Sequence, residues 1–198
     1  NTLAHTVFLN RGGKFEARAL PAVAQFAPVF GINVADFDAD GHEDIFMAQN
    51  FFASQRETPR SDGGRGLLMR GDGKGGFTPM PGQDSGLKIY GEQRGSAVAD
   101  FNHDGRPDLV VTQNGSHTHL YQNIQARPGL RVKVNAGTAN PTGVGAIVRL
   151  KFAEGRLGPA RLITAGSFSS TWMASLCTAS CAWATMLKSD IAVASATA

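Results

Sequence analysis

The sequence predicts an all-β protein made of short strands, and three observations support this fold class. Glycine is abundant, with 24 residues in a chain of 198, as expected where turns are frequent. Short apolar runs bounded by glycine and aspartate recur along the chain, which is typical of strands. An acidic loop pattern occurs twice, each time between two such runs. No long amphipathic helix pattern precedes residue 167, so we expect little helix.

The acidic pattern reads D-x-D-x-D-G-x-x-D, at residues 36–44 (the first loop) and residues 100–108 (the second loop). Calcium is a hard cation whose six to eight oxygen ligands lie at about 2.3–2.6 Å. Oxygens at positions 1, 3 and 5 of a tight loop converge, glycine at position 6 permits the sharp turn, and position 7 offers its backbone carbonyl. The expected calcium ligands are Asp36, Asp38, Asp40, His42 (backbone carbonyl) and Asp44 in the first loop, and Asp100, Asn102, Asp104, Arg106 (backbone carbonyl) and Asp108 in the second.

Two alternatives compete with this calcium hypothesis. An EF-hand needs a glutamate at position 12 between two helices, whereas Met47 and Val111 stand there within apolar runs. Plain hairpin turns also use aspartate and glycine. However, the two loops hold eight of the chain's sixteen acidic residues, and clustered carboxylates repel one another unless a cation lies between them. The first loop has four carboxylates and the second has three and an amide, so we expect tighter binding in the first.

The strands are expected in pairs joined by glycine-rich turns. Residues 6–10 form an apolar strand, Arg11-Gly12-Gly13 turns, and residues 14–15 begin the return strand. Strands should also flank both acidic loops, since β-branched and apolar residues stand on either side. These further strands are expected at residues 33–35, 45–47, 67–70, 97–99, 109–111 and 119–123, with a return strand from residue 77.

Residues 1–124 resemble FG-GAP/VCBS-type repeats of integrin-α-like β-propellers. The resemblance rests on the two D-x-D-x-D-G-x-x-D loops, each followed by a strand and a glycine-rich hairpin, and Asn102 departs from it only by replacing an aspartate. It implies a partial propeller: the end of one blade at residues 1–15, a fuller unit around residues 30–80 and another from about residue 94. Closed propellers have about four to eight blades, so we expect either the remaining blades in a longer parent chain or another partner that pairs with the open sheet edge.

Residues 125–166 are expected to form a small C-terminal β segment. Residues 130–134 and 147–152 alternate in the manner of half-buried strands, with a glycine-rich turn at residues 140–146 and a third strand within residues 159–166. The Leu-Arg-Val-Lys-Val, Asn-x-x-Gly-x-Gly-Ala and Arg-x-Ile-Thr-Ala-Gly stretches make this segment similar to the ASPIC/UnbV domain. That resemblance implies no catalytic motif.

Residues 167–198 differ from the rest of the chain, because they are rich in alanine, serine and threonine and hold both cysteines and both tryptophans. The ASPIC/UnbV resemblance stops at Gly166. We therefore expect this tail to be disordered or non-native sequence, such as the product of a shifted reading frame. Residues 162–187 lack charge, but their many serines, threonines and glycines argue against a membrane anchor.

Charge and composition narrow the functional classes. The formal charge is +3, yet lysine and arginine are scattered singly without interleaved aromatics, so we expect no nucleic-acid partner. Two cysteines near the end give no disulfide framework for the main body. Weak calcium loops stay filled where calcium is millimolar, which favours an extracellular, cell-surface or periplasmic location.

The resemblance implies a non-catalytic calcium-binding module that mediates adhesion or another interaction, with a protein or carbohydrate ligand. The sequence holds no G-x-S-x-G, P-loop or H-E-x-x-H motif, so we do not expect an enzyme. Two alternatives stay open at this point. One is the scaffold of a propeller enzyme, such as a polysaccharide lyase, and the other is a structural spacer in a large repeat protein.

Overall fold

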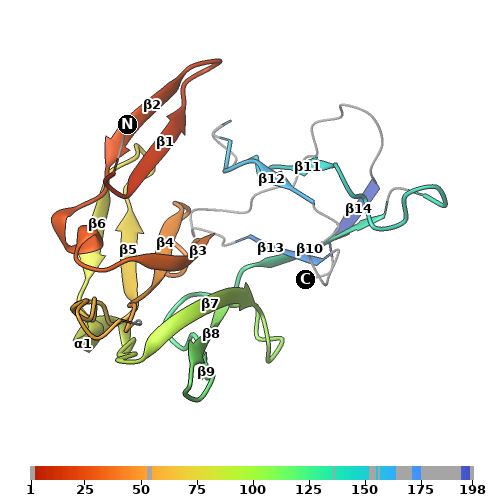
Figure 1. Cartoon of the computed structure of the whole chain (residues 1–198). Coiled ribbons are helices and arrows are strands. Elements are labelled where there is room, and N and C mark those ends of the chain that lie inside the picture. Colours follow the sequence, from red (N-terminus) through yellow and green to blue (C-terminus); the bar gives the residue numbers. More distant parts are fainter. Residues whose placement is uncertain are drawn as a thin grey trace. The chain divides into compact units, whose positions relative to one another are not determined.

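The computed structural model describes residues 3–52, 55–135, 137–151, 155, 157–163, 171–174 and 193–196. The chain divides into two compact units. The first unit contains Asn1–Ala35, Glu43–Ala99 and Asp108–Asn123, and the second contains Asp36–His42, Asp100–Pro107 and Ile124–Ala198. The described residues form antiparallel sheets with almost no helix (Figure 1), so the all-β prediction is confirmed for them.

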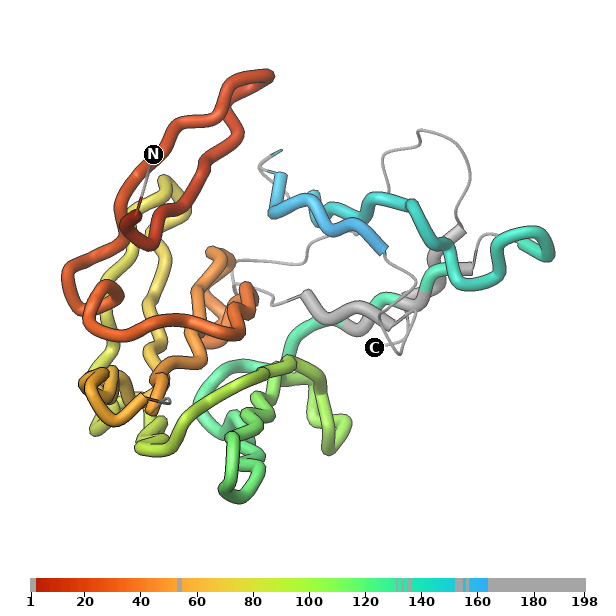
Figure 2. The backbone as a smooth tube through the Cα atoms, in the orientation of Figure 1, coloured from red at the N-terminus to blue at the C-terminus, as the bar shows by residue number. Residues whose placement is uncertain are grey.

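The first unit is built of hairpins between strands that follow one another in sequence, as the tube in Figure 2 makes easy to trace. It contains one two-stranded sheet (β1-β2), one four-stranded sheet (β3-β4-β5-β6) and one three-stranded sheet (β7-β8-β9). Two short helical turns, η1 and α1, complete it. The elements are β1 (Thr6–Asn10), β2 (Phe15–Ala19), η1 (Ala22–Gln25), β3 (Val29–Ala35), β4 (Asp44–Gln49), β5 (Leu67–Gly71), β6 (Phe77–Met80), α1 (Gly82–Ser85), β7 (Glu92–Ala99), β8 (Asp108–Asn114) and β9 (His119–Tyr121).

The two acidic loops join equivalent strands, since the first links β3 to β4 and the second links β7 to β8. Ala35 pairs with Asp44 in one hairpin and Ala99 pairs with Asp108 in the other. Each hairpin also has a register shift immediately before a glycine, Gly31 or Gly95. Such bulges bend and twist a strand. The two repeats therefore share their strand register as well as their sequence pattern. The strand expected at residues 33–35 is longer in the structure, because β3 begins at Val29.

The core of the first unit lies against one face of the β3–β6 sheet. Ile45 and Met47 of β4 are buried there together with Leu67 and Met69 of β5, and residues before β3, including Leu20, cover them. β4 is buried along its whole length, which explains its continuous apolar run from residue 45 to residue 48.

The residues that cover β4 and β5 leave part of β3 exposed on the same face of the sheet. Val34 pairs with Ile45 and Ile32 pairs with Met47, so each pair lies on one face of the sheet. However, Ile32 and Val34 are 61% and 50% exposed, whereas Ile45 and Met47 are 7% and 0% exposed. The apolar face of the sheet therefore continues beyond the part that the described residues cover.

The second unit contains a sheet in which β10 (Leu130–Asn135) lies between β13 (Thr171–Ala174) and β14 (Val193–Ala196). A separate pair joins β11 (Ile147–Val148) to β12 (Arg161–Leu162). Val132, Val134, Val148 and Ile163 form its apolar cluster. Of the expected strand at residues 147–152, β11 covers Ile147 and Val148, Lys151 makes an isolated bridge with Leu157, and residue 152 lies outside the described residues.

The turn before β11 has the conformation that its glycines predict. Asn140 Oδ1 accepts a hydrogen bond from the Val144 N–H, and Asn140 Nδ2 donates to the Val144 carbonyl. Gly143 has φ +68°, and a Cβ there would lie 2.5 Å from Val134 Cγ1. Within the tail at residues 167–198, the structure describes only β13 and β14. The expectation that this tail is disordered or non-native therefore stays a prediction.

Candidate metal centre

The first loop folds around the carboxylate of Asp36. The N–H groups of Asp40 and Gly41 donate to Asp36 Oδ1 and Oδ2 at 3.1 and 2.9 Å. Asp38 Oδ1 accepts from the Asp40 N–H at 3.2 Å, and Asp40 Oδ1 accepts from the His42 N–H at 2.8 Å. Short side chains that accept from the backbone a few residues later are the usual chemistry of tight loops, so the D-x-D-x-D-G spacing determines this conformation locally.

The loop needs left-handed backbone at two places. Gly41 has φ 89°, which glycine adopts without strain, and Ala39 has φ 63° although it carries a side chain. Ala39 is buried. The sequence predicted the glycine but not the left-handed alanine, because alanine has no preference for that region.

The conformation gathers three carboxylates. One oxygen from each of Asp36, Asp38 and Asp40 lies within 4.8 Å of the others. Burial, together with the charges of Asp40 and Asp38, raises the pKa of Asp36 to about 6, although the hydrogen bonds from the Gly41 and Asp40 N–H groups lower it. The cluster therefore concentrates negative charge that a cation would stabilise. Carboxylate oxygens are the ligands that calcium prefers, so these residues fit such an ion.

The second loop has the same four backbone hydrogen bonds. Asp104 N–H and Gly105 N–H donate to Asp100 Oδ1 and Oδ2 at 3.0 and 3.1 Å. Asn102 Oδ1 accepts from the Asp104 N–H at 3.1 Å, and Asp104 Oδ1 accepts from the Arg106 N–H at 2.9 Å. The prediction that Asn102 can replace an aspartate here is thus consistent with the geometry, since its amide oxygen makes the same bond.

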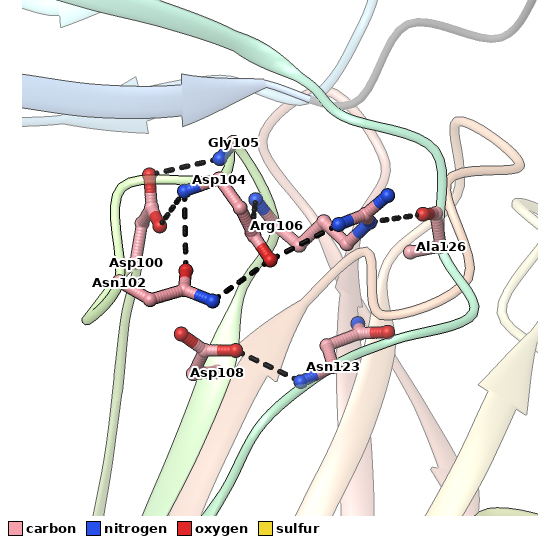
Figure 3. A network of polar contacts seen from close by, with 8 residues as sticks. All are labelled: Asp100, Asn102, Asp104, Gly105, Arg106, Asp108, Asn123 and Ala126. Carbon is pink, nitrogen blue, oxygen red and sulfur yellow. Dashed lines mark hydrogen bonds and ion pairs between the residues drawn. The ribbon is translucent and has the colours of Figure 1, made fainter.

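The second loop differs in how its charge is balanced (Figure 3). Asp104 Oδ2 accepts from Asn102 Nδ2 at 2.9 Å and pairs with Arg106 Nη1 at 3.0 Å. These contacts, with the Asn102 hydrogen bond the largest, lower the pKa of Asp104 below its usual value of 3.8. The sequence predicts a role only for the backbone carbonyl of Arg106. The pairing of its side chain with Asp104 was missed, although an arginine two residues after an acid is a usable signal.

The ninth residues of the loops, Asp44 and Asp108, are buried at the start of β4 and β8 in the first unit. Asp44 Oδ1 accepts from the Gly71 N–H at 2.9 Å, and Asp108 Oδ1 accepts from the Asn123 N–H at 2.8 Å. Asp44 therefore holds the last residue of β5, and Asp108 holds the chain two residues after the end of β9. The residues at positions 1, 3 and 5 of each loop come together within the second unit. Asp44 and Asp108, at position 9, belong to the first unit.

Together the fold and the loops define a β-rich repeat protein with acidic loops of a kind suited to cations. Residues 94–122 match the FG-GAP repeat, which spans most of β7, the whole second loop, β8 and β9. A comparison with curated proteins gives no match. Among the residues that the structure describes, no helix is long and apolar enough to cross a membrane.

Proposed function

We propose that this chain is a calcium-binding, β-propeller-like module in which the ions have a structural role. The observation that carries this proposal is that both acidic loops have the same four hydrogen bonds from backbone N–H groups to side-chain oxygens. One of these loops lies inside the matched FG-GAP repeat, and the other gathers three carboxylates.

The first loop would hold calcium through Asp36, Asp38 and Asp40, and the second through Asp100, Asn102 and Asp104. Asp44 and Asp108 at position 9 and the carbonyls of His42 and Arg106 at position 7 are the further ligands that we propose. A bound ion supplies positive charge that offsets the repulsion within each cluster. Because the site forms only when the loop is folded, ion binding contributes to folding stability.

The propeller-like part of the proposal is supported by the open apolar face at Ile32 and Val34. In a longer parent chain, strands of a further blade would cover these side chains and continue the layer that protects Ile45 and Met47. We assign residues 125–166 to an ASPIC/UnbV-like segment following the repeats. Its Asn140–Val144 hydrogen bonds and the left-handed Gly143 support that assignment.

We further propose that the module is non-catalytic and serves adhesion or another interaction with a protein or carbohydrate, outside the cell, at its surface or in the periplasm. Millimolar calcium in such a compartment would keep even weak loops filled. A repeat module stabilised by ions rather than by disulfides suits this role, and both cysteines lie in the tail.

Thermal unfolding followed by circular dichroism tests the calcium proposal directly. We expect a β-type spectrum and a midpoint that falls clearly when excess EDTA replaces calcium, because the ligand binds only the folded state. An equal concentration of magnesium should substitute poorly, since magnesium demands near-octahedral geometry. An unchanged midpoint in calcium and EDTA would mean that the aspartates serve only as turn residues.

A further inference from the structure

The second loop contacts the segment that leads out of the repeats at two points. This linker segment, residues 124–129, precedes β10. The Gly129 N–H donates to the Gly105 carbonyl at 2.6 Å, and Arg106 Nε donates to the Ala126 carbonyl at 2.6 Å. A Cβ on Gly105 would lie 3.1 Å from Pro128 Cβ, so the loop and the segment are in close contact.

Arg106 connects that segment to the acidic cluster. Its Nη1 pairs with Asp104 Oδ2 while its Nε donates to the Ala126 carbonyl, so one guanidinium joins a loop carboxylate to the backbone of the linker segment (Figure 3). The side chains of Arg106 and Asp104 are 26% and 22% exposed, so water screens this pair only in part. A planar guanidinium with several donors can make both contacts at once. The first loop has His42 in the same place, which lacks such a fork.

We propose that Arg106 is a positioning residue that transmits calcium binding in the second loop to the linker segment, and so orders the start of β10. This inference rests on the proposed calcium binding. An ion held by the second loop would fix the Asp104 carboxylate, which in turn fixes the guanidinium and its Ala126 partner. The ion would also restrain the loop backbone, including the Gly105 carbonyl that accepts from Gly129.

Amide hydrogen exchange of the full chain, measured by NMR with calcium and with EDTA, tests the inference at Gly129. We expect calcium to slow exchange of the Gly129 amide about tenfold, because restraining the loop and the charge-assisted Arg106 contact opposes local opening of the linker segment. An Asp38→Ala chain, which loses one carboxylate of the first loop, should show the same slowing of Gly129 exchange by calcium, because the second loop is unchanged. Arg106→Ala removes the side chain but keeps the backbone carbonyl proposed as a ligand, so calorimetry should still detect calcium binding while the Gly129 response shrinks severalfold.

Arg11→Ala is the matched control, because Arg11 also joins a carboxylate, Glu16, to a backbone carbonyl, that of Lys74. It should leave the Gly129 response at the wild-type value. If wild-type chain binds calcium but Gly129 exchange does not change, the inference is wrong, and this result needs no variant that might misfold. An Arg106→Ala response equal to wild type would also overturn it. Absence of calcium binding in calorimetry would instead refute the proposed function.

Discussion

Phe30 and Arg94 occupy the same place in the two repeats, and they contact each other. Each stands immediately before the glycine that follows the bulge of its hairpin. The guanidinium carbon of Arg94 lies 4.1 Å from the centre of the Phe30 ring and 5.1 Å from that of Phe51. The bulges thus bring together two residues that a regular strand would place differently, and a cation–π contact joins the repeats within the first unit.

The charge network beside this contact should make stability depend on pH. Glu92 accepts from Asn114 Nδ2 and the Phe52 N–H and pairs with Arg94. These contacts, with Asn114 the largest, lower its pKa below the usual 4.5. A carboxyl whose pKa is lower in the folded state contributes stability above its unfolded pKa and loses it as pH falls through the folded pKa.

We therefore expect wild-type chain to lose stability more steeply than Glu92→Gln when the pH falls below about 4.5, in urea unfolding at fixed calcium. Above that pH, Glu92→Gln should be the less stable of the two. Glu16→Gln is a useful comparison, because Glu16 also has a lowered pKa but lies in exposed ion pairs. Parallel pH curves for wild type and Glu92→Gln would contradict the assignment.

The two loops should differ in calcium affinity. Asp104 already shares its charge with Arg106, whereas Asp40 lies among carboxylates, so an ion gains more from Asp40. By calorimetry we expect Asp40→Ala to lose about tenfold more affinity than Asp104→Ala, the equivalent of roughly 1.4 kcal/mol. Asp62→Ala, which removes an exposed carboxylate paired with Arg60, should change neither site. A larger loss for Asp104→Ala would reverse the ranking.

Gly105 should tolerate alanine less well than Gly115, although both have left-handed backbone, with φ 84° and 66°. A Cβ at Gly105 would press on Pro128, whereas nothing lies within 4 Å of a Cβ at Gly115. The backbone strain is common to both variants, so the difference reports the contact. We expect Gly105→Ala to lose about 1–3 kcal/mol more than Gly115→Ala in denaturant unfolding. Equal losses of unfolding free energy in the two variants would show that the linker segment can shift away from the new Cβ without destabilising the fold.

Truncation should affect the cross-strand neighbours Met47 and Ile32 very differently. Met47 is fully buried, so Met47→Ala should cost about 2–5 kcal/mol of unfolding free energy. Ile32 is 61% exposed, so Ile32→Ala should cost no more than about 0.5 kcal/mol. Urea unfolding of both variants measures this. A large loss in Ile32→Ala would mean that some part of the chain covers β3 in solution.

The sequence predicted the strands beside the acidic loops because their signals are local. Alternating or continuous apolar residues next to Asp and Gly suffice for residues 45–47 and 109–111, and the loop hydrogen bonds follow from the D-x-D-x-D-G spacing alone. The bulges before Gly31 and Gly95 were not predicted, because they arise from packing between strands. Gly31 shows this, since a Cβ there would lie 2.9 Å from Ser96 Oγ in the other repeat.

The candidate site was predicted only in part for the same reason. Positions 1, 3 and 5 of each loop converge as expected, because they are a few residues apart. The bond from Arg106 to Ala126, 20 residues away, depends on where the linker segment lies, and no local pattern encodes that. Likewise, the hydrogen bonds of Asp44 and Asp108 to Gly71 and Asn123 depend on the return of a later strand.

Those last two bonds have a practical consequence for engineering. They join equivalent places in the repeats, yet Asp44 and Gly71 are 27 residues apart, whereas Asp108 and Asn123 are only 15 apart. The extra length in the first repeat lies between β4 and β5 and leaves the register around the acidic loop intact. The short turn between β8 and β9, at the exposed Gly115, is therefore a natural position for grafting a peptide tag of about a dozen residues.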